Sequence, residues 1–423
     1  MPACSTPATL VCRWAADDNR SGANTALSSS EGRLVELGWG PEEEAFRAEL
    51  IEFLEREAPT EAVGRDFATA GEDEGIPEWA RAWQAKLFDS GWLVPGYPRH
   101  LGGRDATPSQ SLIYAEELAS RGLPRSLHFP GYAIVAPSLL DFGNQEQRQL
   151  APLALRGDTI WCIGMSEPEA GSDLASLSTR AERDGDRFVV NGQKVWTSYA
   201  TWAEKCFCYV RTDADAPKHK GISVLIIDMN SKGVEVRPLK HITGKANFAE
   251  VFFTDVEVPA ANLVGSLNDG WRITMGSLAH ERGGLWVQGV AGLEHVIGVL
   301  TEQAHQLGIE SDVGVRRSLS HAYAQVASLR ALGYKGFSTF AKTSSSPEHS
   351  FLKLASSEMS KSLAELGVQL EGGLGTTLDD SYIDHAGRWA NTLLANFAAT
   401  IAGGTSEIQR NIIAERVLGL PRQ

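Results

Sequence analysis

The sequence contains few cysteines, has a deficit of positive charge and lacks any long hydrophobic run. Five cysteines in 423 residues are too few, and odd in number, for the disulfide framework of a small secreted protein. The formal net charge of −14 argues against nucleic acid or an anionic membrane surface as the main partner. Because no apolar segment has the length that crossing a bilayer requires, we predict no membrane span and a cytoplasmic location.

Two of the cysteines indicate a packed strand and not a metal site. Cys206 and Cys208 stand two residues apart in an apolar run, so their side chains share one face of a strand. A zinc site would also need a second cysteine pair or histidines, and neither accompanies these two cysteines. We therefore interpret them as packed thiols and predict no bound metal.

The length and composition are those of a globular protein with two or three domains. A chain of 423 residues exceeds one compact core, and its hydrophobic content of 43% and charged content of 22% are ordinary. Residues 1–40 differ, because they are rich in alanine, serine, threonine and glycine and lack hydrophobic periodicity. We expect them to be a disordered extension or the product of a start site placed too early.

Hydrophobic periodicity divides the rest of the chain into three parts. Residues 41–158 have helical spacing, residues 159–268 switch to a period of two, and residues 269–423 return to helical spacing. The short β-rich runs of the middle part lie at 160–165, 187–190, 206–211, 222–228, 234–238 and 251–258. The pattern predicts an α+β fold with an N-terminal helical domain, a middle antiparallel β-barrel or sandwich and a C-terminal helical bundle.

Two segments of the middle part have a composition suited to contact with a flat cofactor. Residues 165–173 read MSEPEAGSD, and residues 191–198 read NGQKVWTS. Small residues let the backbone approach a flat ring, Trp196 offers a broad face, and Ser166 and Ser198 offer hydroxyl groups. Taken alone, each segment also fits an ordinary hairpin with a tryptophan in its core.

A third segment, GGTSEIQR at residues 403–410, has the pattern of a helix start. Paired glycines end one element, and Ser406 with Gln409 forms a capping-box pattern that opens the next. The exposed amides of such a helix start attract an anion. A plain capped helix is the alternative interpretation of this segment.

The three segments together resemble the signatures of the acyl-CoA dehydrogenases, which are FAD enzymes that oxidise the α,β-bond of acyl-CoA thioesters. The order helical, β, helical is also that of the family, and the resemblance covers nearly everything after Gly40. It implies that the CoA portion of the substrate meets Ser172. The FAD contacts that it implies are Ile163, Met165, Ser166, Trp196, Ser198, Gln369, Gly372, Gly373, Thr405 and Glu407.

The segment at 369–375 resembles the part of the family that reaches the FAD of a neighbouring subunit, so we expect a homodimer or homotetramer. One feature departs from the family. An Arg-x-Phe-Gly turn usually helps to hold FAD across the dimer, and residues 306–317 contain no such turn. Arg316 or Arg317 either substitutes for it or belongs to a solvated helix start.

The catalytic base has two known locations in the family, and this sequence fills one of them. Many members carry a glutamate directly before the Gly-Thr of the C-terminal signature, where this chain has Gly403. Other members, of the isovaleryl and long-chain type, place it just before an arginine on the first long helix of the bundle. Glu281 falls on that position, and Arg282 matches the substrate-side arginine. A solvated surface pair is the ordinary interpretation of both, and the family match favours the catalytic one.

These observations predict an FAD-dependent acyl-CoA dehydrogenase of fatty acid and lipid metabolism. Glu281 takes the α-proton, the β-hydride goes to flavin N5, and an electron-transfer flavoprotein takes the electrons. Two alternatives stay open. One is a non-catalytic or half-site partner subunit of a heteromer, and the other is a flavin oxidase or monooxygenase on the same scaffold.

Overall fold

A computed structural model describes residues 39–62, 76–126, 128–280, 285–343, 348–378 and 388–421. The expected extension at residues 1–40 lies, except for its last two residues, outside the described residues. Everything from Pro41 onward forms one compact unit. Among the described residues, no helix has both the length and the apolar character needed to cross a membrane.

The N-terminal part is helical, as predicted. Its helices are α1 (Pro41–Glu57), α2 (Glu78–Asp89), α3 (Pro108–Ser120), α4 (Ala136–Phe142), α5 (Gln145–Arg148) and α6 (Leu150–Arg156). Helix α3 begins at a capping box, in which Thr107 Oγ1 accepts from Gln110 N at 3.2 Å and Gln110 Oε1 accepts from Thr107 N at 2.9 Å. Aromatic side chains fill the core, where the rings of Phe46 and Phe53 pack on Trp92.

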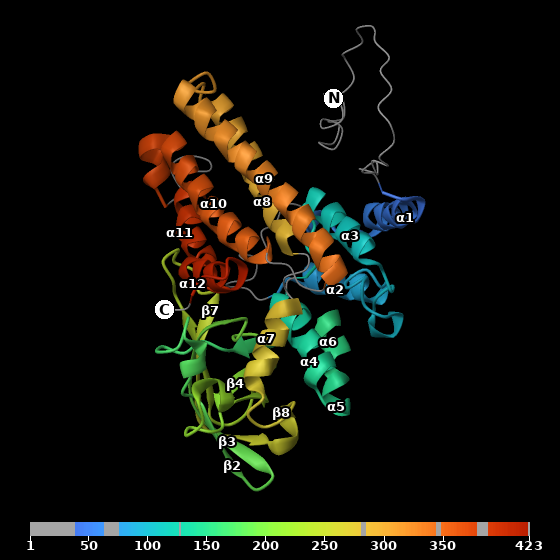
Figure 1. The fold of residues 1–423 in the computed structure, drawn as a ribbon, viewed down its shortest axis with the longest axis vertical. Helices are drawn as coiled ribbons and strands as arrows, with labels where there is room; N and C mark the ends of the chain where they lie inside the picture. The colour runs from blue at the N-terminus through green and yellow to red at the C-terminus, as the bar shows by residue number, and fades with distance from the viewer. Residues whose placement is uncertain are drawn as a thin grey trace. The chain divides into compact units, whose positions relative to one another are not determined.

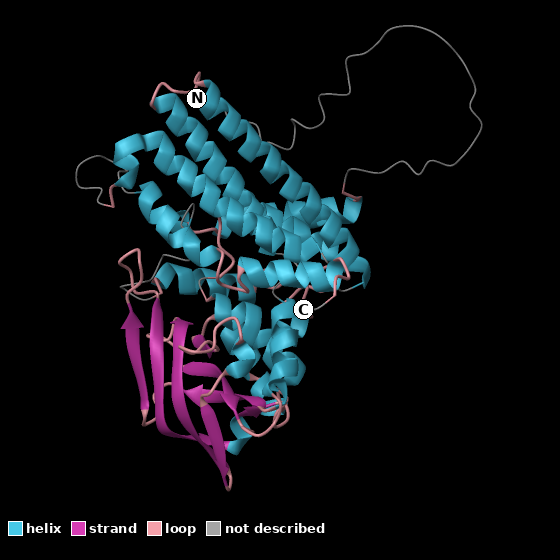
Figure 2. Ribbon diagram, turned by 60° about the vertical axis from the view of Figure 1, so that its left-hand side comes forward, coloured by secondary structure: helices cyan, strands magenta, loops and turns pink. Residues whose placement is uncertain are grey.

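The middle part is one sheet of eight strands. They are β1 (Trp161–Gly164), β2 (Arg180–Asp184), β3 (Arg187–Ser198), β4 (Lys205–Arg211), β5 (Ile222–Asp228), β6 (Val234–Leu239), β7 (Phe248–Pro259) and β8 (Leu263–Val264). The order is β6-β7-β3-β2-β4-β5-β8, with β1 paired to β4. Most pairings are antiparallel, but β4 runs parallel to both β1 and β2. Figure 2 shows the strands gathered in a single magenta layer.

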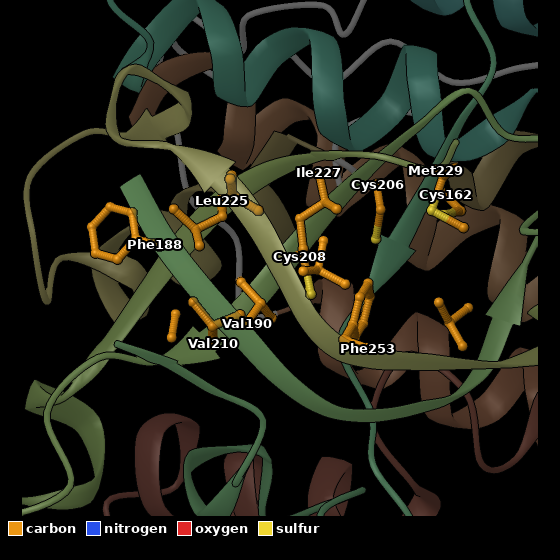
Figure 3. Packing of buried hydrophobic residues seen from close by; sticks show 14 of the residues in the cluster. Cys162, Phe188, Val190, Cys206, Cys208, Val210, Leu225, Ile227, Met229 and Phe253 are labelled. Carbon is orange, nitrogen blue, oxygen red and sulfur yellow. The ribbon is translucent and has the colours of Figure 1, made fainter. Parts of the chain in front are cut away.

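The sequence pattern identified six of these strands and missed β2 and β8. Strand β2 has one buried residue among exposed charged neighbours, and β8 contains only two residues, so neither carries enough apolar alternation. The inner side of the sheet is apolar (Figure 3), and Phe188, Val190 and Phe253 belong to the same buried cluster as Cys206 and Cys208. Both cysteines are free and buried, which confirms that they are packed thiols.

The C-terminal part returns to helices. They are α7 (Gly270–His280), α8 (Leu285–Gln306), α9 (Val313–Thr343), α10 (Glu348–Glu371), α11 (Arg388–Ala399) and α12 (Ser406–Ile412). Helices α8, α9 and α10 pack along one another (Figure 1). Two glycines let helices and tryptophan rings come into close contact. A Cβ at Gly333 would lie 2.2 Å from the Trp286 ring, and a Cβ at Gly367 would lie 2.1 Å from the Trp389 ring. The predicted helical, β, helical fold is confirmed.

Candidate active site

The segment that follows β1 is held close to β3. Val195 N donates to Ser166 O at 2.9 Å, and Lys194 Nζ donates to Met165 O at 3.2 Å. At the end of β1, a Cβ on Gly164 would lie 2.9 Å from Cys208 Sγ, so this close approach requires glycine. Ser166 is half-buried, and among the described residues no protein atom accepts a hydrogen bond from its amide N–H. That amide is therefore available to a ligand.

Lys194 and Glu167 form a buried ion pair beneath this segment. The Nζ–Oε1 distance is 2.8 Å, and both side chains are almost completely shielded from solvent. Glu167 also accepts from the amide and hydroxyl of Ser178, at 2.6 and 2.8 Å, and from the amide of Thr179 at 2.9 Å. Burial opposes ionisation of this carboxyl, but the charge of Lys194 and these hydrogen bonds outweigh it and hold the pKa of Glu167 at about 2.

Trp196 stands out from β3 in an unusual backbone conformation. The register between β3 and β7 shifts between Lys194 and Thr197, and Trp196 has a φ of +58°. A bulky residue adopts a positive φ only where the surrounding structure enforces it. The indole is 55% exposed and rests edge-on against Phe248, with ring centroids 5.8 Å apart. One broad aromatic face is thus presented to solvent.

The residues on either side of Thr197 share the outer face of β3. Thr197 is buried, whereas Trp196 is exposed and Ser198 is half-buried. Thr197 Oγ1 is buried and has no hydrogen-bond partner within the part of the chain that the structure describes. Trp196 and Ser198 thus follow Val195, whose amide bonds to Ser166 O in the segment after β1.

Ser172 lies in an exposed turn between β1 and β2. Asp173, beside it, accepts hydrogen bonds from Ser176 Oγ and, at 2.9 Å, from Lys218 Nζ. These bonds lower the pKa of Asp173. Ser172 itself faces solvent, so its hydroxyl is accessible.

The C-terminal signature begins its helix one residue earlier than the sequence pattern indicated. Thr405 is the N-cap of α12, and its side chain accepts from Ile408 N at 3.2 Å. The predicted capping pair has other partners, since Ser406 Oγ donates to Glu358 at 2.6 Å and Gln409 Nε2 donates to Gly403 O at 3.1 Å. The capping-box prediction is wrong because two successive glycines with positive φ complete the turn before Thr405.

Helix α10 braces this signature at one end and carries the segment at 369–375 at the other. Lys353 Nζ donates to Gly404 O at 2.6 Å, and burial lowers the pKa of this lysine. Glu407, a predicted FAD contact, is exposed and pairs with Arg410 at 3.4 Å. Gln369 stands sixteen positions after Lys353 in α10, which places the two residues about 24 Å apart along the helix axis.

Gln369, Gly372 and Gly373 are all exposed where α10 ends. Gly372 has a φ of +60°, and added Cβ atoms at Gly372 and Gly373 would meet nothing within 4 Å. The apolar side chains of Leu374 and Leu378 are exposed beside them. This end of α10 is open to a neighbouring molecule.

The predicted base and its arginine fall outside the described residues. Glu281 and Arg282 lie in the sequence between the end of α7 and the start of α8. Gly403, the alternative location, has a φ of +64°, and a Cβ there would meet only Lys353 Cε, at 4.0 Å. Arg316 and Arg317 are exposed in the first turn of α9, where Asp312 Oδ1 accepts from Val315 N.

The sequence patterns did not single out Lys194, Glu167 or Lys353. The signal for Lys194 was present, because it continues the inward-facing series of Phe188 and Val190 along β3 at a period of two. A lysine in such a register requires a buried partner. No local pattern indicated Lys353, which contacts the signature only through tertiary packing.

Comparison with known proteins identifies the family. Domain models of the acyl-CoA dehydrogenases match residues 40–156 (N-terminal domain), 162–256 (middle domain) and 268–418 (C-terminal domain). The protein named acyl-CoA dehydrogenase IpdE1 of Mycobacterium tuberculosis (strain ATCC 25618 / H37Rv) is 36% identical over 382 residues, which cover 90% of this chain and 98% of that protein.

Solved structures agree with the sequence comparison. The structure named "Tcur3481-Tcur3483 steroid ACAD" superposes with a TM-score of 0.78 at 30% identity, covering 92% of this chain and 100% of that chain. The ChsE4-ChsE5 complex from Mycobacterium tuberculosis superposes with a TM-score of 0.75 at 31% identity, and the match covers 92% of this chain and 100% of that chain. The three matched domains of this chain, their order and these relatives show that the chain belongs to the acyl-CoA dehydrogenases. This is a flavoprotein family of oxidoreductases that act on CH–CH groups.

Proposed function

We propose that the protein binds FAD and converts an acyl-CoA thioester into the 2-enoyl-CoA. The observation that carries this proposal is the contact between β3 and the segment after β1, where the exposed Trp196 follows Val195, whose amide bonds to Ser166 O. The Ser166 N–H itself has no acceptor among the described residues. The positive φ of Trp196 costs about 1–3 kcal/mol, and among the described residues the exposed indole contacts the ring of Phe248. A flat ring stacked against the indole provides a reason for the strain.

The residues present fit FAD. The Trp196 face suits the isoalloxazine ring, and the Ser166 N–H suits an acceptor atom of its pyrimidine edge. The Ser198 hydroxyl shares the outer face with Trp196. When bound, FAD supplies the hydride acceptor for the β-carbon of the substrate.

Glu281 is the proposed base, and Arg282 the proposed substrate-side arginine. The assignment follows from their positions between α7 and α8 and from Gly403, which has no side chain at the other family location. The Glu281 carboxylate takes the α-proton as the β-hydrogen leaves. Ser172, exposed in its turn, would contact the CoA portion.

We also propose that the active form contains more than one subunit. Lys353, which bonds to Gly404 of the C-terminal signature, and Gln369 lie about 24 Å apart along α10, and only a long ligand or two different ligands would reach both regions. Gln369, Gly372 and Gly373 are exposed, as residues that contact the FAD of another subunit must be.

A heteromeric assembly is the second candidate. Two similar structures have names that join two proteins each, Tcur3481 with Tcur3483 and ChsE4 with ChsE5. The Arg-x-Phe-Gly turn, which helps to hold FAD across a dimer in the family, is missing from residues 306–317. A second protein that supplies this contact would complete the FAD site.

The proposed substrate is a CoA thioester that carries a steroid ring system. A similar structure, at 30% identity over nearly the whole chain, is named a steroid ACAD, and this likeness supports the proposal. The proposed electron acceptor is an electron-transfer flavoprotein, as the family resemblance implies.

The test is the absorption spectrum of the purified protein, followed by anaerobic titration with straight-chain, branched and steroid-bearing acyl-CoAs. We expect flavin bands in the spectrum and bleaching by the steroid-bearing thioester. A yellow protein that no acyl-CoA bleaches would contradict the proposed dehydrogenation, and a colourless protein would favour the partner-subunit function. Rapid reoxidation of the bleached flavin by oxygen alone would favour an oxidase.

A further inference from the structure

The Lys194–Glu167 pair places a buried positive charge against the segment that carries the proposed flavin contacts. Lys194 Nζ is shared between Glu167 Oε1 at 2.8 Å and the backbone carbonyl of Met165 at 3.2 Å. Burying such a pair costs several kcal/mol of desolvation per ion, which Coulomb attraction and hydrogen bonds must offset. Apolar residues of the same volume would hold two strands together at a smaller cost.

The peptide group between Met165 and Ser166 has its two polar ends in different surroundings. Its carbonyl is bonded to Lys194, while its N–H, which belongs to Ser166, donates to no atom of the described chain. The peptide is trans, so the N–H points away from the carbonyl and therefore away from Lys194. The bond from Val195 N to Ser166 O fixes the next peptide as well.

A cation that binds the carbonyl end of a peptide strengthens its N–H as a donor. Hydrogen bonds in series polarise one another, and the effect is larger where burial lowers the local dielectric constant. Lys194 is fully buried, and no solvent separates it from the Met165 carbonyl. The Ser166 N–H is thus a preoriented and polarised donor.

We propose that Lys194 is a positioning residue that favours the reduced flavin through the Met165–Ser166 peptide. The inference rests on the proposed FAD site, in which the pyrimidine edge of the flavin lies at Ser166. Negative charge collects at that edge on reduction, so a polarised donor stabilises reduced FAD more than oxidised FAD. Glu167 in turn holds the ammonium group of Lys194 in place.

The test compares the affinities for oxidised and reduced FAD in the intact assembly. Lys194→Met combined with Glu167→Gln removes both charges and leaves no unpaired buried ion. We expect the preference for reduced over oxidised FAD to fall at least tenfold, which is about 30 mV for a two-electron couple. Ser178→Ala is the control, because it removes one hydrogen bond to Glu167 and leaves the Lys194–Met165 contact intact. It should keep the wild-type ratio.

The outcomes separate this inference from the proposed function. A folded double variant that binds FAD with the wild-type ratio would overturn the role of Lys194 while leaving the proposed function standing. If the unaltered protein bound no FAD, the proposed function itself would fail, and this inference with it. A second measurement needs no variant, namely the Raman stretching frequencies of the pyrimidine carbonyls of the bound flavin. We expect at least one to lie below its value for aqueous FAD, and no downward shift would overturn the inference.

Discussion

Single residues of the site are held in settings that cost free energy. Trp196 has a positive φ and an exposed ring, and Lys194 is buried completely. Each setting costs on the order of 1 kcal/mol or more. Both are on β3 within three residues of each other, which concentrates the cost where the proposed cofactor binds.

The first prediction concerns the proposed base. Glu281→Gln keeps the size and hydrogen-bonding capacity of the side chain but removes its basicity. Substrate should still bind, and the rate of flavin reduction in stopped-flow measurements should fall by more than the ~10²–10⁴ typical of general-base loss. Glu302→Gln, on the exposed side of α8, is the matched control, and its flavin should be reduced at the wild-type rate.

The alternative base location offers a rescue. Adding Gly403→Glu to Glu281→Gln should restore part of the reduction rate, because both family positions serve the same α-carbon. The rescue will be incomplete, since a φ of +64° at residue 403 is strained for glutamate. Near-normal reduction in Glu281→Gln alone would refute the assignment.

The second prediction concerns the proposed flavin platform. Ser198→Ala should leave the folded structure intact and slow flavin reduction, and Trp196→Ala should reduce the quenching of FAD fluorescence. The reason is that both side chains share the outer face of β3. Thr301→Ala, at an exposed hydroxyl position on α8, is the control for Ser198→Ala. Unchanged quenching and reduction rates in both variants would show that the ring lies elsewhere.

At the scale of elements, the approach of β1 to β4 depends on Gly164. A Cβ there would lie 2.9 Å from Cys208 Sγ and 3.1 Å from Cys206 Sγ, so the strands must move apart to accept one. We expect Gly164→Ala to lower the free energy of unfolding by about 1–3 kcal/mol in urea titrations. Gly171→Ala, where nothing lies within 4 Å, is the control. Adding Cys208→Ala should recover part of the loss, and equal stabilities of Gly164→Ala and the wild type would contradict the packing argument.

A buried histidine joins the N-terminal helices to β1. His128 Nε2 accepts from Trp161 N at 2.7 Å. Burial lowers the pKa of His128 to about 4, although the Trp161 carbonyl oxygen, 3.0 Å from Nε2, opposes this shift. In the unfolded chain the pKa is about 6.5, so the unfolded state binds the extra proton between these values. Stability from this group is complete above pH 6.5 and is lost as the pH falls towards 4.

The fourth prediction follows from this loss of stability at low pH. Between pH 7 and 4 the free energy of unfolding should decrease by roughly 3 kcal/mol through His128. Urea titrations at several pH values measure it as the difference between the wild type and His128→Gln. The exposed His219→Gln should retain the wild-type slope. If His128→Gln showed the same slope, another group would be responsible.

At the scale of the whole molecule, α10 connects two groups of proposed FAD contacts. Lys353 braces Gly404 at one end, while Gln369 and two glycines are exposed at the other. The net charge of −14 adds repulsion between identical subunits. In the proposed assembly, burial of the exposed apolar side chains of Leu374 and Leu378 would offset this repulsion.

The last prediction is that FAD and subunits dissociate together. Dilution should release FAD as the assembly separates, because each site draws residues from two subunits. Light scattering combined with flavin absorbance measures both quantities on one sample. Gln369→Ala should weaken FAD binding without changing the mass of the concentrated assembly. A monomer that holds one FAD per chain would contradict the shared site.

Local sequence patterns were enough to predict the three-part order, the family and the positions of the motifs. These follow from local patterns, namely hydrophobic periods and short segments whose residue types are visible without a partner. Six strands were identified because apolar alternation marks them, whereas β2 was missed because four of its five residues are charged and exposed.

The support of the site comes from long-range contacts that the sequence does not reveal. The bulge that turns Trp196 outward arises where β3 pairs with β7, more than fifty residues away in sequence. The α12 cap lies at Thr405 and not Ser406, whose hydroxyl bonds instead to Glu358 of α10. The pairing of Lys194 with Glu167 beneath Met165 likewise needs two strands and a turn in contact. Such contacts join residues that no local pattern connects, because chain folding, and not sequence spacing, sets the distances between them.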